Sequence, residues 1–233
     1  MEYPAPLIPG TLLKRYKRFL ADVRLETGEV VTAHCANSGS MRGCDAPESP
    51  VLLSFRDDPA RKLKYTWELV KVGPTWVGIN TALPNRIVAE AITAGAIPEL
   101  AGYSTLKPEQ KYGQNSRIDL LLSDPEKGRC YVEVKNVTLA EGAQALFPDA
   151  VTERGAKHLR ELSDMVAEGH RAVMVYLVQR EDCDRFWPAE AIDPVYAAAF
   201  ETATATGVEA LCYRCTVTPE GVTVAERLPI TRG

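Results

Sequence analysis

The sequence predicts an α+β protein of two domains, in which a small β-barrel precedes a larger domain with a mixed central sheet flanked by helices. Three observations support this fold class. The first 80 residues hold short segments rich in β-branched and aromatic residues, separated by turn signals. After Asn80, apolar residues at helical spacing alternate with strand-like runs. The chain of 233 residues, 45% of them hydrophobic, can bury a small core and a medium one.

Residues 1–81 are expected to form the barrel. Turn signals at Thr27-Gly28-Glu29 and Gly73-Pro74 separate its segments. Five short strands in so small a module are typical of a compact barrel, and the oligonucleotide-binding β-barrel is the obvious candidate. The strands are expected near residues 11–26, 29–35, 50–56, 63–72 and 75–80.

Residues 82–233 are expected to form the α/β domain. A helix from Pro84 to Ala94 opens it, and a later helix of about 17 residues stops at Gly169. Two strands joined by a turn-rich connection lie between the helices, over residues 117–123 and 129–137. The uninterrupted apolar run 172–178 predicts a central strand that is covered on both faces.

The six cysteines are expected to be reduced thiols rather than a disulfide framework. The pair Cys212 and Cys215 lies in a strand that the sequence predicts over residues 208–217. Side chains three apart in a strand point to opposite faces, which argues against a zinc ion shared by these two thiols.

Composition limits the partners and the location. The net charge is −4, which by itself disfavours nucleic acid, but residues 1–80 hold 11 Lys/Arg and 9 Asp/Glu, with the basic residues clustered near Lys14 and Arg61. No run approaches the roughly 18 apolar residues of a membrane helix, and the N-terminal residues do not resemble a secretion signal. We therefore expect a cytoplasmic protein without a membrane partner.

A candidate catalytic site lies in the paired strands of the second domain. Glu133 and Lys135 are two apart and share one face, while Asp119 interrupts the apolar run of the neighbouring strand. Two carboxylates on adjacent strands repel each other unless a cation lies between them, and Mg²⁺ or Mn²⁺ with oxygen ligands is the usual solution. Glu90, at the edge of the opening helix, is the candidate third catalytic residue and metal ligand; a solvated border glutamate is the equal alternative. The Glu-x-Lys pair has its own alternative, a cross-strand ion pair without catalytic meaning.

Two basic groups are candidate nucleic-acid contacts. The first turns of the later helix form a plausible phosphate cradle, with a capped, solvated helix start as the equal alternative. On the barrel, cations lie beside aromatic rings on which bases could stack, or alternatively form a solvated strand with Tyr16 or Phe19 in the core. The candidate residues are Thr152, Arg154, Lys157 and His158 on the helix, and Lys14, Arg15, Lys17, Arg18 and the loop residue Arg42 on the barrel.

Asp119, followed by Val132-Glu133-Val134-Lys135 with Glu90 on a preceding helix, resembles the active-site signature of the PD-(D/E)XK nuclease superfamily. Ile118 stands where that name would place proline. Over residues 7–230 the chain resembles the sugar fermentation stimulation protein A family. The motifs that carry this resemblance are Asn37-Ser-Gly-Ser-Met41, Leu83-Pro-Asn-Arg86, Ser116-Arg-Ile-Asp119, Tyr131-Val-Glu-Val-Lys-Asn-Val-Thr-Leu139, Phe147-Pro-Asp-Ala-Val-Thr152 and Arg154-Gly-Ala-Lys-His-Leu159.

The resemblance implies an oligonucleotide-binding barrel, a PD-(D/E)XK nuclease-like domain, DNA binding and a regulatory part in bacterial sugar metabolism. Three functional hypotheses follow. The first is a Mg²⁺-dependent phosphodiesterase acting on nucleic acid, most favourably DNA. The second is a non-catalytic, largely non-specific DNA-binding regulatory factor in sugar metabolism of the maltose type. The third, a purely structural role, ranks last. A homodimer is compatible with the sequence, which does not fix the oligomeric state.

Overall fold

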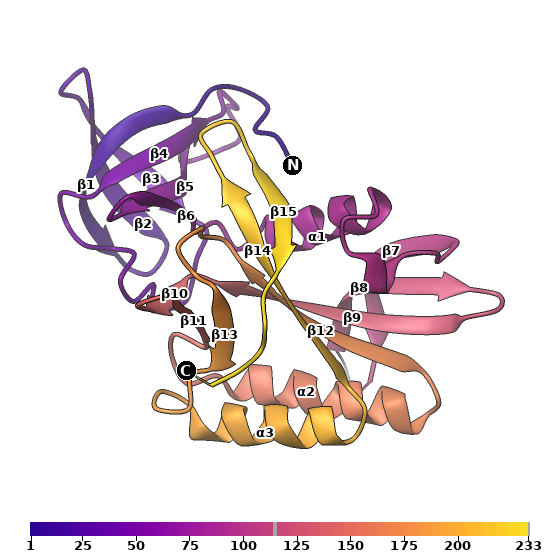
Figure 1. The fold of residues 1–233 in the computed structure, drawn as a ribbon. Helices are drawn as coiled ribbons and strands as arrows, with labels where there is room; N and C mark the ends of the chain where they lie inside the picture. The colour runs from indigo at the N-terminus through magenta and orange to yellow at the C-terminus, as the bar shows by residue number, and fades with distance from the viewer. Residues whose placement is uncertain (114–115, 233) are drawn as a thin grey trace.

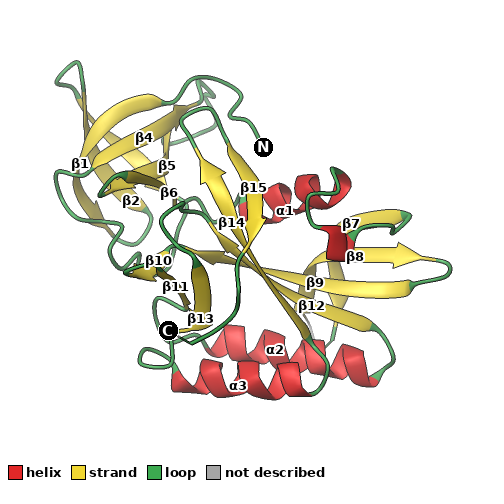
Figure 2. Ribbon diagram, in the orientation of Figure 1, coloured by secondary structure: helices red, strands yellow, loops and turns green. Residues whose placement is uncertain are grey.

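The computed structural model describes residues 1–113 and 116–232 and consists of a β-barrel joined to an α+β domain (Figures 1 and 2). The barrel strands are β1 (Ile8–Tyr16), β2 (Leu20–Leu25), β3 (Val30–Cys35), β4 (Pro50–Phe55), β5 (Tyr65–Val72) and β6 (Thr75–Gly78). Strands β1 to β5 close the barrel, because β3 and β5 at the two ends of their row also pair in parallel. The predicted five-stranded barrel is thus confirmed, and the structure adds that it is closed.

The predicted strand over residues 11–26 is wrong in one respect, because two strands occupy it. β1 and β2 form an antiparallel hairpin that turns at Lys17 and Arg18, with φ angles of 49° and 62°. Residues other than glycine rarely adopt positive φ angles, so the residue types in this basic segment do not predict a turn. The strand expected over residues 75–80 is β6, which pairs with β5 at the end of the row and lies outside the closed ring.

A six-stranded mixed sheet forms the centre of the second domain, in the order β15-β14-β12-β9-β8-β7. β9, β12 and β14 run parallel, and the other pairings are antiparallel. Its strands are β7 (Thr105–Tyr112), β8 (Ser116–Asp124), β9 (Gly128–Val137), β12 (Arg171–Val178), β14 (Glu209–Val217) and β15 (Val222–Arg227). A small three-stranded sheet beside it consists of β10 (Leu139–Glu141), β11 (Gln144–Phe147) and β13 (Arg185–Pro188).

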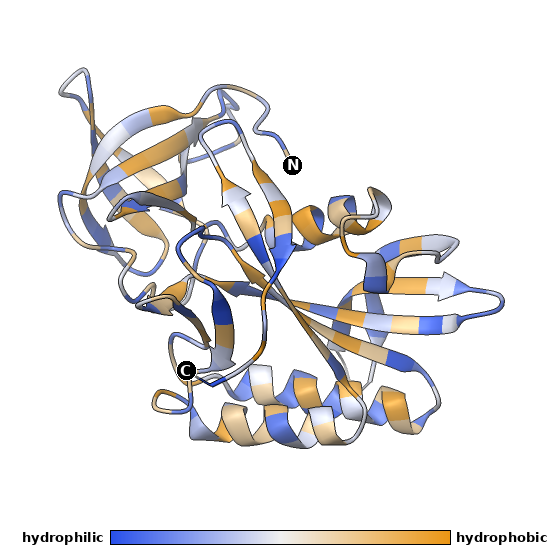
Figure 3. Ribbon diagram, viewed as in Figure 1, coloured by the Kyte–Doolittle hydropathy of each residue, from blue (hydrophilic) through white to orange (hydrophobic). Residues whose placement is uncertain are grey.

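Helices cover both faces of the mixed sheet. The helices α2 (Glu153–Ala167) and α3 (Pro194–Ala205) lie side by side on one face, and α1 (Pro84–Thr93), with the short 3₁₀ turn η1 (Pro98–Leu100), lies on the other (Figure 1). Apolar residues concentrate along the central strands between these layers (Figure 3). Strand β12 contributes alternately to the two cores, since Val173 and Val175 face α1 while Met174 and Tyr176 face α2 and α3. The prediction of a strand covered on both faces is confirmed.

The cysteines lie as the sequence predicts. Cys212 belongs to the core beside α2 and α3, whereas Cys215 belongs to the core beside α1, so the two thiols point to opposite faces of β14. All six cysteines are free and buried, and burial raises the pKa of each thiol. In residues 1–113 and 116–232, no helix is long and apolar enough to cross a bilayer.

Candidate active site between the barrel and the mixed sheet

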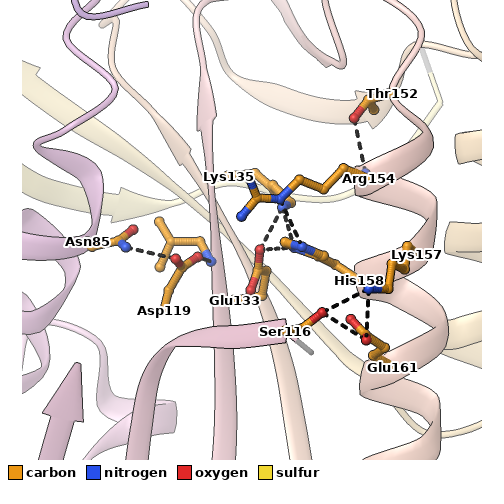
Figure 4. Close-up of polar contacts among 12 residues, drawn as sticks. Asn85, Ser116, Asp119, Glu133, Lys135, Thr152, Arg154, Lys157, His158 and Glu161 are labelled. Atoms are coloured by element: carbon orange, nitrogen blue, oxygen red, sulfur yellow. Dashed lines mark hydrogen bonds and ion pairs between the residues drawn. The ribbon is translucent and has the colours of Figure 1, made fainter. Parts of the chain in front are cut away.

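The site begins where β8 separates from β9. Their pairing runs as far as Leu120 opposite Val132, and beyond this point the Asp119 carboxylate takes the place of a strand partner. The Val134 backbone N–H donates to Asp119 Oδ2 at 2.8 Å, and Asn85 Nδ2, at the start of α1, donates to Oδ1 at 2.8 Å (Figure 4). Both bonds fix the carboxylate on the strand edge.

Glu133 and Lys135 share one face of β9, as predicted, while Val132 and Val134 enter the α1 core. Lys135 Nζ donates to Glu133 Oε1 at 2.7 Å. The same oxygen is hydrogen-bonded to His158 Nδ1 on α2, and Arg154 Nε donates to His158 Nε2 at 3.2 Å (Figure 4). A chain of polar contacts therefore runs from the surface of α2 to a buried carboxylate.

The electrostatics of the two carboxyl groups differ. Burial, and then the nearby charge of Glu133, raise the pKa of Asp119. Burial also acts to raise the pKa of Glu133, but the Lys135 ammonium and the His158 hydrogen bond outweigh it and leave this pKa below its usual value. Glu133 is therefore an anion at neutral pH, held inside the protein by cationic and polar neighbours.

One feature of the Glu133 carboxylate fits a divalent cation. The buried Glu133 Oε2 atom has no hydrogen-bond partner among the described residues, although its carboxylate is charged. A buried anionic oxygen left unpaired is costly, and a hard cation with oxygen ligands would pair with it. The described part of the chain nevertheless holds no group of three or more His, Cys, Asp or Glu side chains arranged for a metal, so the acidic part of the site is the pair Asp119 and Glu133.

A cleft of about 640 Å³ opens above these groups, and both domains line it. The second domain contributes the floor, with Asp119, Glu133 and Lys135, and one wall that continues to α2. The barrel contributes Arg18 and the loop from Asn37 to Ser40. This volume lies within the usual range of ligand-binding pockets.

Asp149, in the segment before α2, ties the barrel loop to the second domain. Ser40 Oγ donates to the Asp149 carbonyl at 2.8 Å, and the Met41 N–H donates to Asp149 Oδ2 at 2.7 Å. Gly39 packs so closely here that a Cβ atom would lie 3.1 Å from the Asp149 carboxylate. A bridge between the domains thus forms part of the cleft lining.

Most of the predicted helix residues line the cleft, but their roles differ from the prediction. Thr152 accepts a hydrogen bond from the Gly155 N–H, so its side chain caps α2. His158 is buried and bonded to Glu133, so the expectation that it contacts phosphate directly is corrected. Arg154 is exposed at the rim. Lys157 lies outside the cleft, where it contacts Ser116 and Glu161.

Glu90 does not join the acidic pair. Its carboxylate forms ion pairs with the Met1 ammonium at 2.9 Å and with Arg86 at 2.7 Å, and these lower its pKa. The Met1 residue lies there because Glu2 pairs with Gly221 beside β15. The helix position that meets Asp119 is Asn85, so the expectation that Glu90 is a catalytic residue and metal ligand is corrected.

The basic residues of the barrel differ in their positions and contacts. Arg18 lines the cleft, and Lys17 and Arg42 are exposed. Lys14 pairs with Asp22 at 3.4 Å on the barrel surface. The expectation that Arg15 contacts nucleic acid is corrected. Its side chain is only 10% exposed, and its guanidinium donates to the backbone carbonyls of Arg18, Asn37, Gly39 and Ser40. Arg15 supports the loop that lines the cleft rather than reaching for a ligand.

Sequence reasoning missed three residues of the site. Asn85 lies within the motif Leu83-Pro-Asn-Arg86, and Asn37 and Asp149 lie within two other quoted motifs, so their positions were visible but their roles were not. Asn37 Oδ1 accepts from the Gly39 N–H at 2.9 Å, and its Nδ2 donates to the Ile79 carbonyl at 3.0 Å. The signal that could have found them is the presence of short polar side chains beside glycine and proline in loops.

The raised pKa of Asp119 predicts a stability effect. An acid whose pKa is higher in the folded state than the usual 3.9 costs stability once it ionises, so the penalty appears as pH rises and is fully present at neutral pH. Asp119→Asn should therefore raise the melting temperature at pH 7.5 in chelator, and each 1 kcal/mol of relieved penalty would appear as a rise of about 2 to 4 °C. The gain should shrink as the pH falls towards 4.

Thermal melts from pH 4 to pH 8 test this expectation. Asp57→Asn is the matched control, because the Asp57 side chain is 73% exposed and should show no such gain. A lower melting temperature for Asp119→Asn at pH 7.5 would show that the buried charge of Asp119 stabilises the fold.

Comparison with known proteins places both domains in one family. The family model described as the SfsA N-terminal OB domain matches residues 13–79, and the model described as the sugar fermentation stimulation protein RE domain matches residues 82–221. A sugar fermentation stimulation protein homolog from Geobacter sulfurreducens is 59% identical over 233 residues, with 100% of each chain covered. A homolog from Rhodospirillum centenum is 62% identical over 232 residues, which cover 99% of this chain and 100% of that one.

A solved structure is similar over the whole chain. The structure of Pyrococcus furiosus SfsA in complex with Ca²⁺ has a TM-score of 0.91 and 26% sequence identity, and the alignment covers 100% of this chain and 98% of that chain. The arrangement of barrel and mixed sheet is therefore shared between the two proteins.

Proposed function

This chain belongs to the sugar fermentation stimulation protein family, and from that premise we propose that it binds nucleic acid, most favourably DNA, and hydrolyses phosphodiester bonds with the help of Mg²⁺ or Mn²⁺. The proposed reaction site is the floor of the cleft. The metal requirement is proposed from the residues themselves and from the Ca²⁺ in the similar Pyrococcus furiosus structure.

The observation that carries the proposal is the unpaired oxygen of Glu133. A buried carboxylate with one free oxygen, beside a second carboxyl group whose pKa is raised, is a poor arrangement for stability alone. The arrangement suits a site in which the free Glu133 oxygen gains a partner when a cation and a phosphate bind. Asp119 and Glu133 would hold that cation, which would polarise a phosphoryl oxygen and neutralise charge that hydrolysis builds up there.

The other residues of the cleft have separate tasks in this proposal. Lys135 lies at the Glu133 carboxylate, where its ammonium can orient the attacking water or stabilise negative charge on the phosphate. Asn85 and the Val134 N–H hold Asp119 in place, and His158 holds Glu133. In the hydrolysis, the attacking water loses a proton to solvent as its oxygen bonds to phosphorus, the bond from phosphorus to the leaving sugar oxygen breaks, and that oxygen takes up a proton from solvent.

Arg154 and Arg18 are suited to binding the substrate rather than to catalysing the reaction. Both are exposed cations that line the cleft, one on α2 and the other on the barrel. They can contact the phosphates that flank the one being cleaved.

A cleavage assay tests the proposal. Labelled single-stranded, duplex and branched DNA, and the corresponding RNA, are incubated with Mg²⁺, Mn²⁺ or EDTA. We expect cutting with either cation, none in EDTA, and none in Asp119→Ala. Glu90→Gln is the matched control, because this carboxylate is outside the site and its variant should cut normally.

Binding measured in the same reactions separates the two main functions. Salt-sensitive binding without cutting of any substrate would contradict the catalytic proposal and favour the non-catalytic regulatory factor in sugar metabolism. Gel filtration of the same samples would decide whether a homodimer forms, which stays a prediction from the sequence.

A further inference from the structure

Two phenylalanines of the barrel are exposed although they are large and apolar. Phe19 is 48% exposed at the turn between β1 and β2, and Phe55 is 44% exposed at the end of β4. Phe55 also contacts the ring of Tyr65, with 5.1 Å between the ring centroids. An exposed aromatic ring offers a face on which a nucleic-acid base can stack.

Strand register brings these rings to one region of the barrel. His34 on β3 is paired with Leu20 on β2 on one side and with Thr66 on β5 on the other, and Thr66 is paired with Ser54 on β4. Phe55 is paired with Tyr65, and Tyr65 is paired with Ala33, whereas the Phe19 carbonyl accepts from the Cys35 N–H, two residues further along β3. The Phe55–Tyr65 pair and Phe19 therefore lie on either side of His34 along the strands, with β3 between them and neighbouring strands about 4.8 Å apart.

Basic residues accompany the rings at both ends of the row. Arg18 is next to Phe19 in sequence and lines the cleft that holds the carboxylates. At the other end, the connection from β4 to β5 holds Arg56 and Lys62, both exposed, and Arg61, which donates to Thr66 at 3.0 Å. Cations alternating with exposed rings are typical of surfaces that bind single-stranded nucleic acid.

The shape of the cleft favours one strand over two. Glu133 lies at its floor and is almost completely buried, and Ser40 and Met41 are hydrogen-bonded to Asp149 beside it. Double-stranded DNA is stiff, with a persistence length of about 50 nm, so bending it into a space of about 640 Å³ would cost free energy. A flexible single strand can bend so that one phosphodiester reaches the floor.

We infer that the substrate is single-stranded nucleic acid, whose bases stack on Phe55, Tyr65 and Phe19 and whose backbone passes Arg18 into the cleft. This inference rests on the proposed function for the reaction itself, but not for binding. It assigns the barrel the task of holding the strand and the second domain the task of cutting it.

Fluorescence anisotropy tests the inference without cleavage. Labelled oligodeoxythymidine and a duplex of equal length are titrated with protein in EDTA and again in Ca²⁺, over a range of salt concentrations. We expect the single strand to bind more tightly than the duplex. Phe19→Ala and Phe55→Ala should each weaken its binding about 5- to 100-fold, the loss typical of one stacked base.

The matched control is Val30→Ala, because Val30 is a 56% exposed apolar residue at the other end of β3 and its variant should bind normally. Thermal melts of each variant show whether the barrel remains folded. Tighter binding of the duplex, or normal binding by both folded phenylalanine variants, would overturn the inference. Tight single-strand binding without cleavage would support the inference while contradicting the proposed reaction, so the two can fail separately. An oligouridine arm decides whether RNA shares the surface.

Discussion

Lys135→Ala is expected to lower the cleavage rate about 10²- to 10³-fold, while nucleic-acid binding persists. The Lys135 ammonium lies 2.7 Å from Glu133 Oε1 at the floor of the cleft, and removing it takes away the cation beside the proposed attacking water. The same substitution leaves Glu133 with His158 as its remaining described partner at that oxygen, which disturbs the site further. Single-turnover cleavage in Mg²⁺ measures the effect.

Two controls make the Lys135 result interpretable. Lys107→Ala removes one positive charge from an exposed position on β7, so it should cut at the normal rate. Lys135→Arg keeps the charge in a larger, planar group, and we expect only partial recovery of the rate because the geometry of the donor changes. Normal cleavage by Lys135→Ala would exclude this residue from the reaction.

Arg15→Ala is expected to destabilise the protein by about 2 to 4 kcal/mol, which lowers the melting temperature by about 4 to 16 °C. The guanidinium of Arg15 donates to four backbone carbonyls in and beside the loop that lines the cleft. Without it, these carbonyls lose charged donors in a partly buried position, and the loop can separate from the barrel. Thermal melts measure the change.

Arg42→Ala is the matched control for Arg15→Ala. Arg42 follows the same loop and its side chain is exposed, so its loss should change the melting temperature by less than about 2 °C, as is usual for surface substitutions. An Arg15→Ala protein as stable as the wild type, with weakened nucleic-acid binding, would instead restore Arg15 as a direct phosphate contact.

Long periodic elements could be predicted from the sequence, because their apolar residues repeat with the period of the structure. The helix α2 and the strand β12 are of this kind. The helix α3 was not foreseen because its sequence, Pro194–Ala205, is mostly alanine and threonine without a clear apolar stripe. The edge strand β7 was missed because it is mainly exposed and contains Pro108, which disfavours a strand assignment.

The site was predictable where chemistry depends on neighbours in sequence or on adjacent strands. Alternation along β9 placed Glu133 and Lys135 on one face. Glu90 and Asn85 both lie on the opening helix, and the choice between them depends on how that helix packs across the sheet, which periodicity does not determine. Arg15 was misjudged for a similar reason, since its carbonyl partners come from a loop more than 20 residues away.

The burial of all six thiols leaves the protein's surface free of native cysteine within the described residues. A single cysteine introduced by Val151→Cys, at a 71% exposed position that lines the cleft, would be the one readily labelled group on that surface. A dye attached there could report, by energy transfer, how closely the end of a bound oligonucleotide approaches the carboxylates. Because the native cysteine thiols are buried, the protein is suited to single-molecule spectroscopy without first removing them.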